Sequence, residues 1–265
     1  NIYFNKVNMF SDDYVKEELT YIARKISQTG IVHATFADNN FGMIPRDFNT
    51  TKILSELQTK YSWPKTITVW TGKNSKKRVI NATRLLGKTL NISMSVQSMD
   101  SEVLKNLKRD NIRLEDFRAI AKEITRQERP QISEVITPSP GETLKSYFDS
   151  IDALLDIGID NIYSYTLQAL HGTPYKDDEA FIKKYGYITK FRIVPQDFTE
   201  IDGSRIFDVE EVAVATKDMS FDDYLEARKY LLVIILCKGC FKPLELYLKQ
   251  HNIQVSEWIK NIFNN

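Results

Sequence analysis

Five clusters of hydrogen-bonding side chains stand along this chain, each directly after a run of β-forming residues. Amide, hydroxyl and carboxylate groups of this kind can bind a polar small molecule, and neighbouring glycines let the backbone approach it closely. Because the carboxyl ends of parallel strands meet at one edge of a sheet, we expect the clusters to converge there. The clusters lie at residues 38–42 with Arg46 and Asp47, and at residues 71–74, 95–98, 134–143 and 168–174.

Strands and helices must position these clusters. The β-forming runs begin at residues 31, 66, 90, 132 and 162, and stretches with helical spacing of apolar residues lie between them. A further helix precedes the first run, with Ser11 as its cap and Gly30 at its end. Alternation of this kind predicts an α/β fold with a parallel sheet and right-handed crossovers. The predicted helices lie at residues 12–26, 47–60, 76–86, 100–108 and 113–127 and from residue 144 onward.

The order of elements predicts that the chain is a piece of a longer protein. A crossover helix needs a strand before it, and residues 1–10 are too few and too polar to form a buried one. We therefore expect a first strand and its loop upstream of Asn1.

The pattern changes after residue 175. Residues 191–195 predict a short strand and residues 196–204 a loop. Ser220 and Asp223 make a capping-box-like start to a long helix, and two shorter helices follow, from Pro243 and over residues 255–263. We divide the chain into a sheet domain at residues 1–175 and a C-terminal extension at residues 176–265.

Net charge, apolar runs and cysteine content limit the classes of protein to which this chain can belong. The 265 residues are 42% apolar and 27% charged, and a net charge of +1 argues against a nucleic-acid partner. No apolar run is long enough to span a membrane. Two cysteines, Cys237 and Cys240, do not form a secreted disulfide framework and are interpreted as structural. We expect a reducing, cytoplasmic location.

The third strand has one polar face. A packed core would not favour that face unless a ligand or a polar network meets it. On the fourth strand, Glu134 shares a face with two isoleucines and needs a partner if it is buried. The alternating residues of the third strand are apolar Ile92, Met94 and Val96 and polar Ser93, Ser95 and Gln97.

Each cluster also has a purely structural interpretation. Asp38 and Asn40 could cap the helix that begins near Asp47. Gln97 could be a solvated strand end, and residues 138–141 could be only a tight turn. The tyrosines are interpreted as strand and core residues rather than as a stacking surface, and they are Tyr163, Tyr165, Tyr185 and Tyr187.

Taken together, four of the motifs resemble those of the radical S-adenosylmethionine (SAM) superfamily. The motifs are Asp38-Asn39-Asn40-Phe41-Gly42, Ser95-Val96-Gln97-Ser98-Met99, Pro140-Gly141-Glu142-Thr143 and Leu170-His171-Gly172-Thr173-Pro174. The resemblance covers roughly residues 1–175 and implies a partial (β/α)6 TIM-like barrel that lacks its first strand, with a mainly helical extension. It implies an iron–sulfur oxidoreductase that cleaves SAM reductively to a 5′-deoxyadenosyl radical.

The resemblance also implies roles for particular residues. It places Asp38, Asn39, Asn40, Phe41 and Gly42 against the methionine part of SAM. Ser95 and Gln97 would contact the ribose. The adenine side would be formed by Ile136, Pro140, Gly141, Gln168 and Leu170, and Glu134 completes the expected SAM-binding set. No catalytic residue is assigned.

Two departures from the superfamily pattern affect the mechanism. The three-cysteine motif that holds the [4Fe–4S] cluster is absent from this sequence, so we expect it upstream of Asn1 and expect this chain alone to be inactive. Pro138 departs from the usual loop sequence and lacks a backbone N–H.

The implied partners are a small-molecule or other substrate of unknown identity and an electron donor such as flavodoxin or ferredoxin. The closest resemblance within the superfamily is to the class with an upstream cobalamin-binding domain.

Two other functions remain open at this point. A different (β/α) enzyme could bind a phosphorylated ligand at Gly141 and Gly172, where helix N-termini attract anions. Alternatively, the chain could be an inactive barrel that serves as a binding module.

Overall fold

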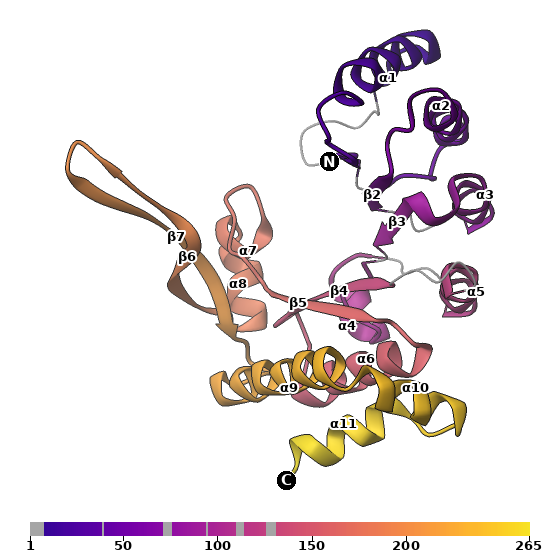
Figure 1. Cartoon of the computed structure of the whole chain (residues 1–265). Coiled ribbons are helices and arrows are strands. Elements are labelled where there is room, and N and C mark those ends of the chain that lie inside the picture. The colour runs from indigo at the N-terminus through magenta and orange to yellow at the C-terminus, as the bar shows by residue number, and fades with distance from the viewer. Residues whose placement is uncertain (1–7, 39, 71–75, 94, 110–113, 126–130) are drawn as a thin grey trace. The chain divides into compact units, whose positions relative to one another are not determined.

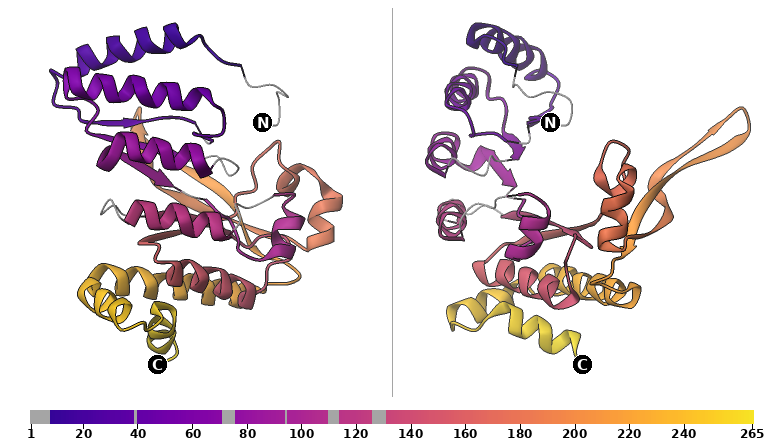
Figure 2. Two further views of the ribbon diagram at one scale, coloured as in Figure 1. Left: turned by 90° about the vertical axis from the view of Figure 1, so that its right-hand side faces the viewer. Right: turned by 180° about the vertical axis from the view of Figure 1, so that it is seen from behind.

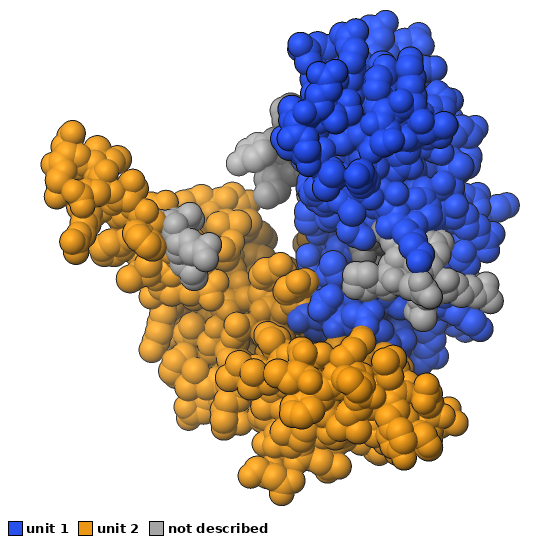
Figure 3. All heavy atoms as spheres, viewed as in Figure 1, with its two compact units in different colours: residues 1–96, 110–134, 157–162 blue, residues 97–109, 135–156, 163–265 orange. Residues whose placement is uncertain are grey.

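The computed structural model describes residues 8–265 apart from 39, 71–75, 94, 110–113 and 126–130 (Figure 1). The chain divides into two compact units, which are coloured separately in Figure 3. The first unit contains residues 1–96, 110–134 and 157–162, and the second contains residues 97–109, 135–156 and 163–265. The sequence-based division at residue 175 concerns the extent of a barrel and stays a prediction.

The predicted alternation of strands and helices is confirmed as an α/β fold. The strands follow the order β1-β2-β3-β4-β5, and the pairs β1–β2, β2–β3 and β3–β4 are parallel. Each strand begins within two residues of the predicted start. Their bounds are β1 His33–Thr35, β2 Thr66–Trp70, β3 Leu90–Ser93, β4 Ile132–Thr137 and β5 Asn161–Thr166.

The helices of the first unit all lie on one side of its strands, as Figures 1 and 2 show from different directions. As predicted, Ser11 caps the first helix, because its side chain accepts a hydrogen bond from the backbone N–H of Tyr14 at 3.1 Å. The bounds are α1 Asp12–Ile26, α2 Arg46–Tyr61, α3 Lys76–Leu86, the short 3₁₀ helix Gly87–Thr89 and α5 Leu114–Thr125.

The strands of the first unit have one apolar and one polar face because successive side chains alternate. On β2, Ile67 and Val69 are fully buried, whereas Thr66, Thr68 and Trp70 are only partly buried. The apolar face therefore packs on the helices, as the sequence predicts, and the polar face is left for other contacts. The predicted apolar partner Met94 lies outside the described residues.

The second unit has a helical core formed by α6, α9 and α11. Three aromatic rings meet there: Phe148 lies 4.6 Å from Tyr230 and 5.7 Å from Phe263, measured between ring centroids. The predicted capping box of Ser220 and Asp223 is present at the start of α9. The bounds of the helices in this unit are α4 Ser101–Asn106, α6 Leu144–Ile157, α7 Pro174–Asp177, α8 Glu179–Tyr185, α9 Phe221–Cys240, α10 Lys242–Gln250 and α11 Val255–Phe263.

A long antiparallel hairpin replaces the predicted short strand and loop. Strand β6 runs over Ile188–Ile201 and β7 over Ser204–Ala215, so the loop predicted at residues 196–204 is wrong. The turn between the strands is Asp202-Gly203, and both residues have positive φ angles, 50° and 77°. An Asp-Gly pair is a strong hairpin signal, because this type of turn needs left-handed backbone at both positions.

The predicted core tyrosines fall into two groups. Tyr185 and Tyr187 are buried and pack with Leu167 and Ala213, as expected. Tyr163 and Tyr165 are strand residues, but they are 47% and 52% exposed, so the core prediction is wrong for them. They occupy the face of β5 opposite to its buried residues. None of the described helices is long and apolar enough to cross a membrane.

Candidate functional site

The loop between β1 and α2 is shaped by two carboxylates. Asp38 accepts a hydrogen bond from the N–H of Asn40 at 2.8 Å. Asp47 turns back from the first turn of α2 and accepts from the N–H groups of Gly42, at 2.7 Å, and Ile44, at 3.1 Å. Burial raises the pKa of Asp47, and these two backbone bonds partly oppose that effect. Asp38 therefore closes its own turn and does not cap α2, whose N-cap is Pro45.

Position 42 requires glycine for two reasons, its left-handed backbone conformation and the lack of room for a Cβ atom. Its φ is +86°, and a Cβ built there would lie 2.8 Å from Val79 Cγ2. Arg78 holds the same residue by donating from Nε to its carbonyl at 2.9 Å. The neighbouring Phe41 is 5% exposed and stacks on Phe36, so its side chain belongs to the core. Asn39, the remaining residue predicted in this loop, lies outside the described part of the chain.

Glu134 has the partners that the sequence predicts it needs. Its half-buried carboxylate accepts hydrogen bonds from the Ser95 hydroxyl and from Trp70 Nε1, the latter at 3.4 Å. The backbone of Trp70 in turn accepts from the N–H of Phe41 at 2.9 Å. Within the first unit, Trp70 thus connects the loop of residues 38–42 to the predicted pair Ser95 and Glu134.

The polar face continues to the other end of the same strands. His33 bonds to the hydroxyl of Thr66 through Nδ1, at 2.8 Å, and to that of Thr35 through Nε2, at 3.0 Å. This histidine therefore has a structural role, because both of its ring nitrogens are engaged by hydroxyl groups. The hydroxyl, imidazole, indole and carboxylate groups of this face suit a polar ligand better than a packed apolar layer.

In the second unit, the predicted residue Gln97 has a buried side-chain acceptor that lacks a hydrogen-bond donor among the described residues. Its φ is +63°, unusual for a residue with a side chain, and its carbonyl accepts from the N–H of Ile136 at 3.1 Å. Its side-chain oxygen Oε1 is buried and has no hydrogen-bond partner among the described residues. A buried acceptor without a donor costs free energy, so a ligand donor would stabilise it. A buried oxygen does not fit the alternative of a solvated strand end.

Glu142 holds the loop that follows β4. Its buried carboxyl accepts from Thr137 Oγ1, at 2.8 Å, and from the N–H of Ser139, at 3.0 Å. Burial raises the pKa of Glu142 to about 7, although both hydrogen bonds oppose that shift. The loop is therefore fixed by an internal carboxyl group.

A side chain already lies against each of the two glycines proposed as a phosphate site. Gly141 has a φ of +84°, and a Cβ built there would lie 2.5 Å from Nδ2 of Asn106, which fills the space beside it. Asn106 also donates to the carbonyl of Pro140 at 3.0 Å. The N–H of Gly172 already donates to the carboxylate of Asp177, and this bond is the main cause of the lowered pKa of Asp177. These contacts argue against the phosphorylated-ligand alternative.

Two residues predicted on the adenine side differ in their surroundings: Gln168 is already hydrogen-bonded within the protein, and Leu170 is exposed. Gln168 donates from its side-chain amide to Glu210 and pairs with Val212 of β7. Leu170 is 54% exposed. Ile136, by contrast, packs beside the buried cluster of Leu167, Tyr185, Tyr187 and Ala213.

Sequence reasoning missed several residues that shape these loops. Trp70 could have been found, because it follows Thr66 and Thr68 at the period of two on the polar face of β2. Glu142 lies within the quoted motif of residues 140–143. Asn106 and Arg78 reach their loops from other elements and have no local signal.

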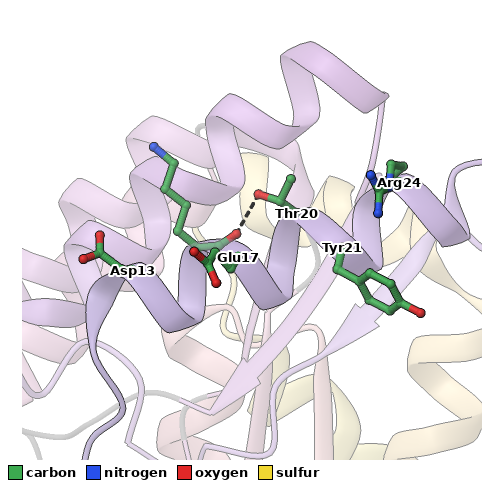
Figure 4. A pocket seen from close by; sticks show the side chains of 6 residues that line it. Asp13, Glu17, Thr20, Tyr21 and Arg24 are labelled. Carbon is green, nitrogen blue, oxygen red and sulfur yellow. Dashed lines mark hydrogen bonds between the residues drawn. The ribbon is translucent and has the colours of Figure 1, made fainter.

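Other described features do not suggest catalysis. A hollow on the outer side of α1 is lined by side chains of that helix alone (Figure 4). It is formed by Asp13, Lys16, Glu17, Thr20, Tyr21 and Arg24. Among the described residues there is no group of three or more histidine, cysteine, aspartate or glutamate side chains that could hold a metal ion.

Comparison with known proteins relates the chain to one enzyme class. No family model matches it. It is 28% identical over 255 residues to the cobalamin-dependent radical SAM methyltransferase TokK of Streptomyces tokunonensis, covering 92% of this chain and 36% of TokK. It is 29% identical over 259 residues to the 2-(S-pantetheinyl)-carbapenam-3-carboxylate methyltransferase of Streptantibioticus cattleyicolor, covering 93% of this chain and 36% of that enzyme. The chain thus spans about a third of the length of the curated relatives it matches.

A solved structure supports the fold. The radical SAM methyltransferase TsrM from Kitasatospora setae, with tryptophan and a SAM analogue bound, matches with a TM-score of 0.53. The match covers 71% of this chain and 36% of TsrM, at 14% sequence identity. Together with the two curated relatives, this match confirms the resemblance of this chain to the radical SAM superfamily, first indicated by its strand-end motifs.

Proposed function

We propose that this chain is the SAM-binding part of a cobalamin-dependent radical SAM methyltransferase. The observation that carries the proposal is the match to two methyltransferases over more than nine-tenths of the chain. Both relatives are described as methyltransferases, so methyl transfer replaces the oxidoreductase class expected from the sequence. The full-length protein is proposed to use SAM, a [4Fe–4S] cluster and cobalamin.

The fold proposed for the full-length protein is a partial (β/α)6 barrel. In this proposal β1 is the second barrel strand, and the first strand and the three cluster cysteines precede Asn1. Residues 1–175 form the barrel part and residues 176–265 the extension. The five-stranded order and the alternating helices support this arrangement.

SAM is proposed to contact the two groups of polar residues described above. The loop of residues 38–42 would meet its methionine part through backbone groups, because Phe41 is committed to the core. Ser95 and Gln97 would contact the ribose, and the buried free oxygen of Gln97 fits a ribose hydroxyl donor. Glu134 would orient Ser95. Ile136, Pro140, Gly141, Gln168 and Leu170 are proposed for the adenine side.

When bound, the cluster would supply the electron for reductive cleavage of one SAM molecule to a 5′-deoxyadenosyl radical and methionine. Cobalamin would carry the methyl group of a second SAM molecule. The residues of this chain do the positioning. Gly42 and Gly141 hold left-handed turns that keep the loops in place. Asp47 and Glu142 fix those loops with internal hydrogen bonds, so the loops need not reorganise when a ligand binds.

A small organic molecule is the proposed methyl acceptor. The matched relative from Streptantibioticus cattleyicolor is named for a carbapenam carboxylate, and TsrM is described with tryptophan. An external electron donor such as flavodoxin or ferredoxin would reduce the cluster.

Binding of radiolabelled SAM tests the proposed site. The full-length protein, reconstituted anaerobically with iron and sulfide, should bind SAM, and Gln97→Ala should weaken binding about tenfold, as expected when one buried hydrogen bond to the ligand is lost. Gln250→Ala, at the exposed end of α10, is the matched control and should bind as the unmodified protein does. Equal affinity of the two variants would reject the role of Gln97.

A further inference from the structure

The β6–β7 hairpin carries an exposed apolar stripe on one of its two faces. Directly paired residues of an antiparallel ribbon share a face, and here Ile193 pairs with Val209 and Phe198 with Phe207. Phe191 lies two residues before Ile193 and therefore on the same face. The stripe consists of Phe191, Ile193, Phe198, Phe207 and Val209, which are 71%, 58%, 74%, 55% and 55% exposed.

The opposite face of the hairpin differs in character. Its pairs are Lys190 with Val212, Arg192 with Glu210, Thr199 with Ile206 and Ile201 with Ser204. Arg192 and Glu210 form an ion pair with Nε and Oε1 2.6 Å apart. This face therefore mixes an ion pair and hydroxyl groups with the exposed Ile201 and Ile206. The five stripe positions are all apolar, and their face becomes charged only beyond them, at Glu200 with Arg205 and at Glu211.

At its base the hairpin is covered, and along its length it is not. Val212, Ala213, Val214 and Ala215 are all buried in the second unit. Residues 204–209 of the same strand are all exposed, and the ribbon extends as an arm of its unit in Figure 1. An isolated two-stranded ribbon is only marginally stable in water, so an apolar stripe of this length needs a cover.

The size of the stripe indicates what kind of cover it takes. Its exposed side chains amount to roughly 500 Å², given about 150–250 Å² for each aromatic ring. An equal partner area gives about 1,000 Å² in total, below the roughly 1,200–2,000 Å² of stable complexes between separate chains. It lies within the roughly 600–1,500 Å² typical of contacts between domains of one polypeptide.

We propose that the stripe is the docking surface for another domain of the same full-length polypeptide. Domains held on one chain meet at a high effective concentration, so a contact of this size is sufficient. The matched relatives are long enough to contain further domains, since this chain spans 36% of each. The inference concerns assembly and rests on the proposed function only for the expectation of further domains.

Site-specific cysteine labelling of the full-length protein tests this proposal. Phe198→Cys and Phe207→Cys place thiols on the stripe. Thr199→Cys and Ile206→Cys place matched thiols one residue away on the opposite face. Labelling by a maleimide, read at each site by peptide mass spectrometry, should be at least about tenfold slower on the stripe than on the opposite face. This difference should not change when the protein is diluted.

Chemical cross-linking and hydrogen exchange of the unmodified protein guard against variants that fail to fold. Cross-links from the hairpin should reach residues of the same polypeptide outside this chain, and amides of residues 204–209 should be protected. Equal labelling of both faces overturns the proposal. So does protection that disappears on dilution with links between two copies, or cross-links that stay within these 265 residues. None of these outcomes depends on SAM binding, so failure of the proposed function would be seen separately.

Discussion

At Gly42, a single side-chain atom would disturb the loop that carries much of the predicted site. Gly42→Ala would add both strain at a φ of +86° and a contact of 2.8 Å with the buried Val79. We expect it to lower the free energy of unfolding by about 2–4 kcal/mol, measured by urea denaturation.

Gly30→Ala is the matched control for that substitution. Gly30 has a similar φ of +79°, but nothing lies within 4 Å of a Cβ built there. Its replacement should cost only about 1 kcal/mol, the cost of backbone strain alone. Equal losses for the two variants would show that the contact with Val79 has no effect.

Glu142 predicts a specific dependence of stability on pH. Because burial raises its folded-state pKa from 4.5 to about 7, the folded protein holds a proton that the unfolded chain releases between these values. The contribution of Glu142 to the free energy of unfolding is therefore largest below pH 4.5, and it falls as pH rises through about 7. Between pH 5 and pH 8 the loss from this group should be about 2 kcal/mol.

The Glu142→Gln variant isolates this contribution. Glutamine cannot ionise, so the variant should lack the loss of about 2 kcal/mol between the two pH values. The measurement is urea denaturation of both proteins at pH 5 and pH 8. An identical pH dependence in the variant would mean that Glu142 is not the group responsible.

Individual site contacts were predictable where a local rule applies. The alternation around Glu134 indicates a polar partner, and Ser95, just beyond the end of β3, supplies one. Asn106 was not predictable, because its contact with Pro140 joins residues 34 positions apart. Such contacts depend on how elements pack, which no local pattern in the sequence reports.

At the scale of elements, one buried carboxylate joins α9 and α10. Glu245 is fully buried, and its carboxylate lies 3.1 Å from Lys238 Nζ and 2.6 Å from Lys249 Nζ. Burial alone would raise the pKa of Glu245, but the bond from Lys249 and the charge of Lys238 lower it below its usual value. The resulting stabilisation is present above that usual pKa and is lost as pH falls.

We expect Glu245→Gln to lower the free energy of unfolding by about 3 kcal/mol, because the buried Lys238 would lose the negative charge that Glu245 places 3.1 Å from its amine. Thermal or urea unfolding at neutral pH measures the change. Lys242→Gln is the control: its amine is 3.6 Å from Glu245 on a half-exposed side chain, and the cost should be below about 1 kcal/mol. A small loss for Glu245→Gln would contradict a stabilising role for the buried group.

The elements themselves were predictable to different degrees. The strands of the parallel sheet and their helices follow from hydrophobic periodicity, and β2, β3 and β4 begin at the predicted residues. The β6–β7 hairpin was missed in part because its register shifts between Ile193 and Phe198, which interrupts the alternation. The Asp202-Gly203 turn was the available signal for the second strand.

At the scale of the whole molecule, the proposed chemistry needs groups of the full-length protein that lie outside these 265 residues. The strand-end motifs and the two methyltransferase relatives support the proposal of a radical SAM enzyme, and the parallel α/β sheet is compatible with it. The proposed division of labour is that residues of this chain hold SAM while cysteines outside it hold the cluster. The hairpin stripe would join this chain to another domain.

Formation of 5′-deoxyadenosine is the decisive test of whether the full-length protein cleaves SAM reductively. The full-length protein, purified and reconstituted without oxygen, is incubated with SAM and a strong reductant, and the products are separated by chromatography with mass detection. The account predicts iron–sulfur absorbance and 5′-deoxyadenosine that depends on both SAM and reductant. A protein with neither the absorbance nor the product would contradict it.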